Sequence, residues 1–260
     1  MKQETVHFEI REGLSPRSIL FIHGNLASNR WWIPMEEEWR KSPVRGEGCL
    51  VYAEFRGCGQ SAAPRSDSEV DMHIFAEDFI AVIRRLNRGP FSIVGHSTGG
   101  LIAALMLAKA PELFDRAVLL DPVGATGVTF DASMIQAFEQ MKVDKGLTSA
   151  VIGSTIYQNN AEASFFKDVI VEDAFSAVKA VGHLVLKALD GLDVRQELAK
   201  VSHPVLVLHG EHDQLLPMKD SQALAALLPR GQFEVLPGAG HCANIEKPQM
   251  FTAKVQEFLL

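Results

Sequence analysis

The residues with the clearest chemical potential in this sequence are a serine, an aspartate and a histidine, Ser97, Asp213 and His241, in that order along the chain. A serine hydroxyl is a weak nucleophile at neutral pH, so it requires a base within hydrogen-bond reach and a third group that orients the base. A histidine and a carboxylate can fill these two roles. The three residues are therefore candidates for the nucleophile, the orienting acid and the general base of an acyl-transfer reaction.

Ser97 lies in a glycine-rich segment, GHSTGG at residues 95–100, between two apolar segments. The preceding FSIV sequence predicts a buried strand, and the following LIAALMLAKA sequence predicts a buried helix. A G-x-S-x-G motif between a strand and a helix forms a tight, strained turn that exposes the serine. At the start of the helix, backbone N–H groups and the helix dipole favour negative charge on a substrate oxygen.

Two aspartates are candidates for the orienting acid. Asp213 follows the apolar segment PVLVLHG and His241 follows the next predicted strand, so both are expected at the carboxyl edge of a parallel sheet. Asp121 ends an earlier apolar segment, RAVLL, and is the alternative acid. We favour Asp213, because Asp121 followed by Pro122 is also typical of a turn.

The elements that must position these residues follow from an alternation of short apolar segments with longer segments of helical periodicity. This pattern predicts an α/β fold, a mostly parallel central sheet with helices on both faces. The predicted strands span residues 6–10, 18–23, 49–53, 91–95, 116–120, 204–209 and 232–236. The predicted core helices span residues 74–86, 99–110, 216–228 and 249–260.

One long segment, residues 123–190, interrupts the alternation with helical sequences and no convincing strand. Helices are predicted at 132–143 and 172–189. We interpret this segment as an inserted helical lid, or cap. The α/β core would then comprise residues 1–122 and 191–260.

Several motifs, spread over nearly the whole chain outside the lid, resemble those of the α/β-hydrolase family. The similarity is to its serine-nucleophile branch, which includes esterases, C–C hydrolases and cofactor-free haloperoxidases. The motifs occur in the family's order, as FIHGN at 21–25, FRGCGQS at 55–61, GHSTGG at 95–100, LHGEHD at 208–213 and GAGH at 238–241. The resemblance implies a Ser, Asp, His chain order. It places the acid most commonly at Asp213, although some members take it from the strand that ends at Asp121.

The resemblance also implies the donors of an oxyanion hole. These are the backbone N–H of Thr98, next after the nucleophile, and that of Asn25, with Leu26 as the alternative to Asn25. His23 is expected to brace its loop. Only one predicted strand precedes the FIHGN segment, where the family commonly has a hairpin, so we expect the sheet to begin one strand short. The candidate substrate-pocket residues are Trp31, Trp32, His96, Phe138 and Phe165. The two tryptophans could equally pack beneath the loop.

Composition excludes several classes of protein. The 260 residues carry 25 Lys and Arg against 32 Asp and Glu, a net charge of −7, with no basic segment suited to nucleic acid or an anionic membrane.

There is no signal-peptide pattern and no 18-residue apolar stretch, and the three cysteines form no CxxC pair, so we expect a cytoplasmic protein. His209, His212 and Asp213 lack the spacing of a helical zinc motif, so we expect no metal, and no cofactor is expected either. Oligomeric state cannot be derived from the sequence.

These observations predict a cofactor-independent serine hydrolase whose substrate is a small-to-medium, apolar carboxylic ester. The alternatives on the same triad are C–C bond, lactone, thioester or amide hydrolysis and perhydrolysis, because a shared fold does not select among them. A serine nucleophile in place of aspartate argues against a haloalkane dehalogenase or an epoxide hydrolase. A ligand-binding receptor on a hydrolase scaffold is a further alternative.

Overall fold

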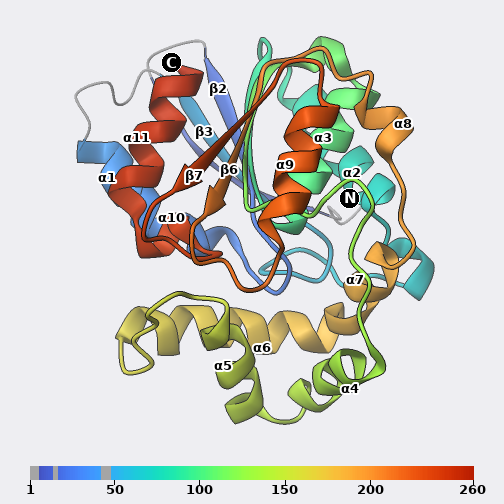
Figure 1. Cartoon of the computed structure of the whole chain (residues 1–260), viewed down its shortest axis with the longest axis vertical. Helices are drawn as coiled ribbons and strands as arrows, with labels where there is room; N and C mark the ends of the chain where they lie inside the picture. The colour runs from blue at the N-terminus through green and yellow to red at the C-terminus, as the bar shows by residue number, and fades with distance from the viewer. Residues whose placement is uncertain (1–5, 14–16, 42–47) are drawn as a thin grey trace.

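The computed structural model describes residues 6–13, 17–41 and 48–260, and these form a seven-stranded sheet with helices on both faces (Figure 1). The sheet order is β1-β3-β2-β4-β5-β6-β7, and every neighbouring pair is parallel except β1 with β3. The strands are β1 (His7–Arg11), β2 (Ser18–Ile22), β3 (Cys49–Glu54), β4 (Phe91–His96), β5 (Phe114–Leu120), β6 (Val205–Gly210) and β7 (Gly231–Leu236). The predicted α/β class is confirmed, and each predicted strand overlaps an observed one. Within the described residues, a single strand precedes β2, as expected.

Alternation along the strands gives the sheet two separate apolar cores. In β2, Ile19 and Phe21 face one core while Leu20 and Ile22 face the other, and the other central strands follow the same rule. Helices cover both faces, so the strands are apolar on both sides. One face is covered by α1 (Ile33–Lys41), α10 (Ala243–Glu246) and α11 (Pro248–Leu259), and the other by α2 (Met72–Leu86), α3 (Thr98–Lys109), α8 (Arg195–Leu198) and α9 (Met218–Leu227). Short 3-10 helices occupy Asn29–Trp32, Asp67–Glu69 and Pro111–Leu113.

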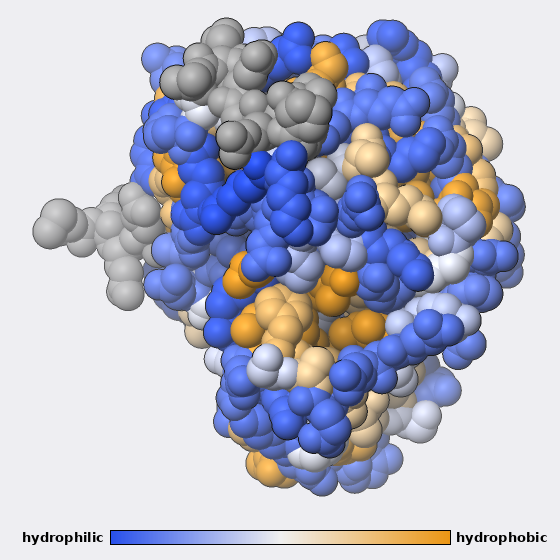
Figure 2. Space-filling view, turned by 90° about the vertical axis from the view of Figure 1, so that its left-hand side faces the viewer, coloured by the Kyte–Doolittle hydropathy of each residue, from blue (hydrophilic) through white to orange (hydrophobic). Residues whose placement is uncertain are grey.

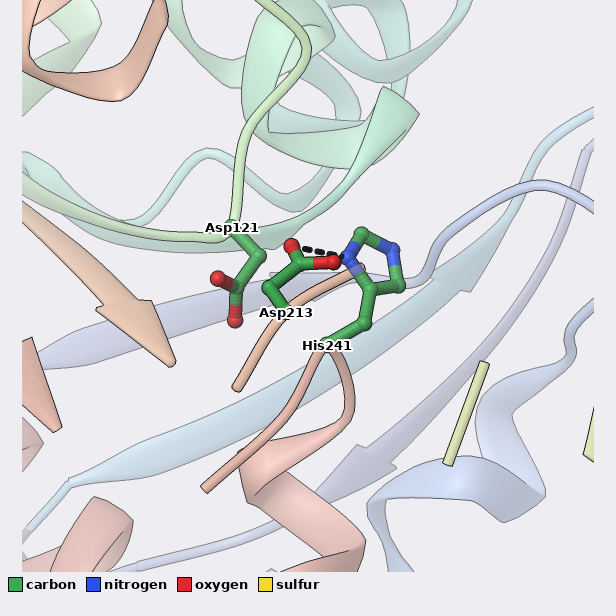
Figure 3. A group of neighbouring side chains, drawn as sticks. All are labelled: Asp121, Asp213 and His241. Carbon is green, nitrogen blue, oxygen red and sulfur yellow. Dashed lines mark hydrogen bonds and ion pairs between the residues drawn. The ribbon is translucent and has the colours of Figure 1, made fainter. Parts of the chain in front are cut away.

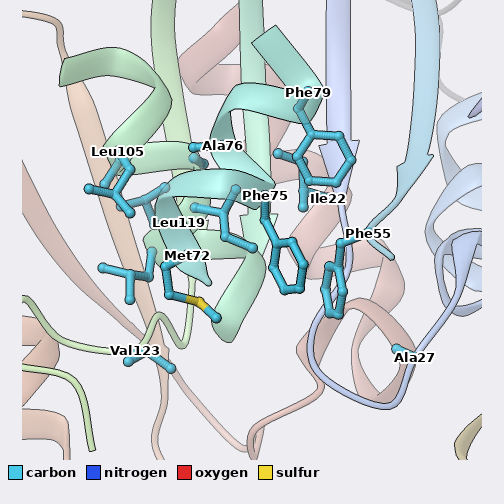
Figure 4. Packing of buried hydrophobic residues seen from close by; sticks show 14 of the residues in the cluster. Ile22, Ala27, Phe55, Met72, Phe75, Ala76, Phe79, Leu105, Leu119 and Val123 are labelled. Atoms are coloured by element: carbon cyan, nitrogen blue, oxygen red, sulfur yellow. The ribbon is translucent and has the colours of Figure 1, made fainter. Parts of the chain in front are cut away.

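Helix α2 shows how periodicity directs this packing. Asp71 caps its start by accepting hydrogen bonds from the N–H groups of His73 and Ile74. Phe75 and Phe79 lie one turn apart and are fully buried, and the ring of Phe75 stacks on Phe55 with the centroids 5.2 Å apart. Figure 4 shows these side chains filling the space between α2 and the sheet.

The segment 123–190 contains four α-helices that lie together beyond the carboxyl ends of the parallel strands (Figure 1). We call this stretch the inserted segment. Its helices are α4 (Ala132–Met141), α5 (Lys145–Ser154), α6 (Val171–Ala180) and α7 (Gly182–Leu189), and a π-helical turn at Phe166–Ile170 leads into α6. The single helix predicted at 172–189 is wrong. The chain breaks at Val181, where φ is −126°, directly before Gly182, which has a low helix propensity.

Helix α3 begins in close contact with the end of β2. A Cβ atom on Gly99 would lie 2.3 Å from the carbonyl oxygen of His23 and 2.5 Å from that of Ile22. Backbone atoms cannot withdraw as a flexible side chain can, so the first turn of α3 requires glycine here.

We therefore predict that Gly99→Ala lowers the free energy of unfolding by about 1 to 3 kcal/mol, measured by urea denaturation. Gly89→Ala is the matched control, because a Cβ on Gly89 has no heavy atom within 4 Å. Its effect should stay within about 0.5 kcal/mol. Equal effects of the two substitutions would contradict the packing argument.

Candidate active site

Ser97 occupies a strained turn between β4 and α3, as the motif predicts. Its backbone has φ 55° and ψ −120°, a conformation that residues other than glycine rarely adopt. The Ser97 N–H donates to the carbonyl of Leu120 at 2.9 Å, and the Ser97 carbonyl accepts from the N–H of Gly100 at 2.9 Å. A Cβ on Gly95 would lie 2.4 Å from the Gly99 carbonyl oxygen. The turn is therefore fixed by its glycines and by a hydrogen bond to the neighbouring strand.

Asp213 and His241 lie in the loops that follow β6 and β7, and their side chains meet (Figure 3). His241 Nδ1 lies 2.8 Å from Asp213 Oδ2, while Asp213 Oδ1 accepts from the N–H groups of Leu215 at 2.7 Å and Leu216 at 3.2 Å. Burial acts to raise the pKa of Asp213. The hydrogen bond and charge of His241, together with the two N–H donors, outweigh that effect and lower the pKa. Asp213 is therefore ionised at neutral pH.

Asp121, the alternative acid, lies beside this pair at the end of β5. Its side chain is fully buried, Oδ1 accepts from the N–H of Gly210 at 2.8 Å, and Oδ2 has no hydrogen-bond partner among the described residues. Burial, followed by the charge of Asp213, raises the pKa of Asp121 well above its usual value. The charged form of Asp121 is therefore disfavoured, and the imidazole of His241 is hydrogen-bonded to Asp213 instead.

Ligand atoms of Asp121, Asp213 and His241 lie within 4.8 Å of one another, the one such cluster in the part of the chain that the structure describes. Asp213 uses both oxygens in hydrogen bonds, and burial disfavours the charged form of Asp121, whose pKa is raised. These groups are a poor ligand set for a cation, which requires deprotonated carboxylates with free lone pairs.

Two buried histidines support the loops of the site. His96 precedes the nucleophile, and its Nε2 lies 2.9 Å from the carbonyl oxygen of His241, so this nitrogen carries the proton and donates. His23 Nδ1 likewise lies 2.7 Å from the Gly24 carbonyl oxygen. Burial lowers the pKa of His96 to about 3 and that of His23 to about 4, so both rings are neutral near pH 7.

The loop after β2 brings Asn25 and Leu26 to the nucleophile. A Cβ on Gly24 would lie 3.1 Å from the Cβ of Ser97, so the loop packs tightly against Ser97 at this glycine. The Leu26 N–H already donates to Asn25 Oδ1 at 2.9 Å, whereas the Asn25 N–H has no partner among the described residues. The Thr98 N–H lies at the first position of α3, where no intrahelical partner exists. The N–H groups of Asn25 and Thr98, near Ser97, are thus without a partner among the described residues.

A cavity of about 160 Å³ connects these groups beneath the inserted segment. Its polar lining includes Asn25, His96, Ser97, Thr98 and His241, and no lysine, arginine, aspartate or glutamate is among the described residues that line it. Its apolar wall comes largely from the inserted segment, through Val128, Phe130, Met134, Phe138, Val151, Ile152, Leu186 and Leu189. Of these residues, Phe138 is among the five predicted pocket residues; the spacing of Leu186 and Leu189 on one helical face is a signal in the sequence that could have found two more.

The cavity reaches the surface beside two exposed side chains, Met134 and Leu215, which are 37% and 43% exposed. On one face of the molecule, apolar side chains also gather in a hollow between its upper and lower parts (Figure 2). The boundary between the core and the inserted segment is therefore apolar both inside and in part outside.

Three of the five predicted pocket residues line the cavity, namely Trp31, His96 and Phe138, and two do not. Trp32 points to the opposite face of the sheet, where its ring lies 5.4 Å from that of Phe21 and stacks on Phe251 at 6.2 Å. Adjacent residues of a short helical turn point in different directions, so the two tryptophans separate. Phe165 lines a second cleft, together with Phe166 and Glu246, outside the catalytic cavity. The prediction for Trp32 and Phe165 was wrong.

The model of the alpha/beta hydrolase family matches residues 19–254. The chain belongs to this family. RutD of Agrobacterium fabrum, named for carbamate hydrolysis, is 27% identical over 265 residues, covering 98% of both chains. The 2-hydroxymuconate semialdehyde hydrolase of a Pseudomonas is 25% identical over 261 residues, 93% of this chain and 86% of the relative. The structure of an enol-lactonase from Burkholderia xenovorans superimposes with a TM-score of 0.82 at 21% identity, over 98% of this chain and 96% of that one. This alpha/beta hydrolase is thus an enzyme with relatives that act on several kinds of bond. None of its described helices is long and apolar enough to cross a membrane.

The environments of the two aspartates lead to opposite expectations for isosteric substitution. Asp213→Asn removes the charge that faces His241, and we expect kcat to fall about 10⁴-fold. Asp121 accepts a hydrogen bond from Gly210 and makes none to His241, so Asp121→Asn should change kcat less than about tenfold. Steady-state kinetics of both variants is the measurement. A larger loss in Asp121→Asn than in Asp213→Asn would assign the acid to Asp121.

The low pKa of His96 predicts an acid-sensitive contribution to stability. The unfolded chain titrates near pH 6.5 and the folded chain near 3, so between these values the unfolded chain binds the extra proton and stability decreases as pH falls. Between pH 7 and pH 5 this group should cost about 2 kcal/mol. His96→Gln keeps a donor for the His241 carbonyl but does not titrate. Between pH 7 and pH 5, the free energy of unfolding of this variant should therefore decrease by about 2 kcal/mol less than that of the wild type. Equal losses in urea titrations of the two proteins would contradict the assignment.

Proposed function

We propose that this alpha/beta hydrolase is a serine hydrolase that cleaves small-to-medium, neutral, apolar carboxylic esters through an acyl-enzyme. The observation that carries the proposal is the 2.8 Å contact between His241 Nδ1 and Asp213 Oδ2, together with the apolar cavity that His241 and Ser97 both line. Nucleophile, base and acid come from three loops at the carboxyl edge of the sheet, where open α/β sheets have their sites.

In the proposed mechanism, Ser97 Oγ attacks the ester carbonyl carbon while His241 Nε2 takes its proton. Asp213 orients the imidazole and stabilises the imidazolium. The N–H groups of Asn25 and Thr98 hold the oxyanion, and each such donor contributes about 3 kcal/mol to stabilisation of the transition state. The tetrahedral intermediate collapses when His241 returns the proton to the departing alcohol. Water, deprotonated by His241, then attacks the acyl-enzyme, and the acid and Ser97 are released.

The lining of the cavity supports a neutral substrate. Burying a carboxylate without a cationic partner is costly, and the described lining offers no such cation. The same feature makes a substrate with free carboxylates, such as the muconate compound in the name of the Pseudomonas relative, a poor match. The inserted segment supplies most of the apolar wall, so we propose that it acts as the lid that selects the acyl chain.

The names of the relatives keep carbamate and lactone hydrolysis as alternatives on the same triad. C–C bond, thioester and amide hydrolysis, perhydrolysis and ligand reception without turnover are the remaining candidates. All of these reactions would proceed through Ser97, whereas ligand reception would not. Experiments must therefore identify the nucleophile and the class of bond separately.

We predict that the protein hydrolyses p-nitrophenyl esters, with an optimum at short to medium acyl chains in the series from acetate to dodecanoate. Ser97→Ala should lower kcat at least about 10³-fold. Mass spectrometry of the wild type treated with a fluorophosphonate should show one adduct, on Ser97. The butyrate ester should have a kcat/KM at least about tenfold above that of the hemisuccinate, which carries a carboxylate into the same cavity.

The outcomes separate the parts of the proposal. Labelling of Ser97 without ester turnover would retain the nucleophile and move the search to carbamates, lactones, thioesters, amides and diketones. Preference for the hemisuccinate would contradict the neutral pocket. The absence of both turnover and labelling would overturn the proposal and favour a receptor.

A further inference from the structure

The carboxylate of Glu246, on the short helix α10, binds three backbone N–H groups from two distant parts of the chain. Glu246 Oε1 accepts from Cys242 at 3.0 Å and from Tyr157 at 3.0 Å, and Oε2 accepts from Gly240. Hydrogen bonds to an ionised acceptor are about twice as strong as neutral ones. One side chain thus joins the loop of His241 to the inserted segment.

The bonds of Glu246 lie on both sides of His241. The residues immediately before and after the histidine, Gly240 and Cys242, donate to this carboxylate, while the carbonyl of His241 itself accepts from His96. Three backbone groups of consecutive residues are therefore fixed from outside the loop. Since the imidazole extends from this backbone toward Asp213, its position depends on these contacts.

The contact with the inserted segment is equally close. A Cβ on Gly240 would lie 2.6 Å from Tyr157 Cβ and 3.2 Å from Tyr157 N, so the two backbones touch directly. The Tyr157 ring stacks on His212, next to Asp213, with the centroids 4.3 Å apart. The two residues before Tyr157 also matter, because Thr155 lines the catalytic cavity and Ile156 is buried.

A second carboxylate joins the inserted segment to the other side of the site. Asp173 in α6 is buried, accepts from Ser28 Oγ at 2.6 Å and pairs with Arg30, in the loop that follows Asn25. This contact leaves the loop of His241 untouched. Glu246 therefore links the inserted segment to the loop of the proposed base by hydrogen bonds on both sides.

We propose that Glu246 is a positioning residue, which holds the His241 backbone in register with Asp213 and couples it to the inserted segment at Tyr157. The inference rests on the proposed role of His241 as the base. Misplacement of a catalytic group by about 1 Å can cost about 100-fold in rate, so loss of three backbone anchors should act mainly on kcat.

The test compares wild type, Glu246→Ala and Glu246→Gln by ester kinetics, thermal unfolding and proton NMR of the His241 Nδ1 hydrogen in its bond to Asp213. Glu246→Ala should lower kcat about 10- to 100-fold and change KM less than about threefold. Glu246→Gln should fall between, because an amide oxygen can keep the bonds to Cys242 and Tyr157 while the amide nitrogen faces the Gly240 N–H. The downfield NMR signal should shift or broaden in the same order.

Glu211→Ala is the matched control. Glu211 also accepts a backbone N–H in this loop, that of Gly238 at 2.8 Å, but its side chain is half exposed and makes no hydrogen bond to Gly240, Cys242 or Tyr157 among the described residues. In this control, kcat should stay within twofold of the wild-type value. The NMR signal of the His241 Nδ1 hydrogen should not shift.

An unchanged kcat in a folded Glu246→Ala protein, with an active wild type, would overturn the inference. If the alanine variant does not fold, Glu246→Gln decides by the same criteria. If the wild type turns over no ester, the proposed function fails for that substrate class, and the NMR signal alone judges Glu246: a signal unaltered in both variants would overturn its positioning role.

Discussion

The steric constraint at the turn between β4 and α3 determines where the rest of the site must lie. Ser97 can hold φ 55° only because Gly95 and Gly99 leave room for the backbones of the strand and the helix to pass within contact distance. That proximity brings the start of α3 to the end of β2, and hence the Asn25 loop to the nucleophile. It also fixes β5 as the neighbour that accepts the Ser97 N–H. The start of α3, the end of β2 and the end of β5 are therefore held together around one strained residue.

The sequence could predict that Ser97, Asp213 and His241 lie at one edge of the sheet, because this depends on topology. Ser97, Asp213 and His241 each follow an apolar strand, and parallel strands end at one edge of the sheet. The choice between Asp121 and Asp213 depends on which carboxylate has donors around it. The hydrogen bonds to Asp213 come from the turn that follows it and from a loop near the end of the chain, and neither partner could be assigned from the sequence alone.

Side-chain direction and helix breaks were not predictable in the same way. Trp31 and Trp32 are adjacent and chemically identical, yet Trp31 lines the cavity while Trp32 stacks on Phe251 on the opposite face of the sheet. The break at Val181 depends on a local loss of helical geometry before a glycine, which a periodic apolar pattern does not reveal. Helix α1 was not anticipated, because its sequence IPMEEEWRK is mostly polar and has only a short apolar stripe. Glu246 carried no signal at all, since its role comes from backbone partners.

The two sides of the cavity opening differ in how freely they can change during evolution. Leu215 belongs to the same turn whose N–H groups hold Asp213, so insertions or deletions there would disturb the acid as well as the opening. Met134 lies on α4, which makes no hydrogen bond to Asp213, His241 or the loop of Asn25 among the described residues. Substitutions in α4 should therefore alter the opening of the cavity with less effect on Asp213 than changes in the turn of Leu215.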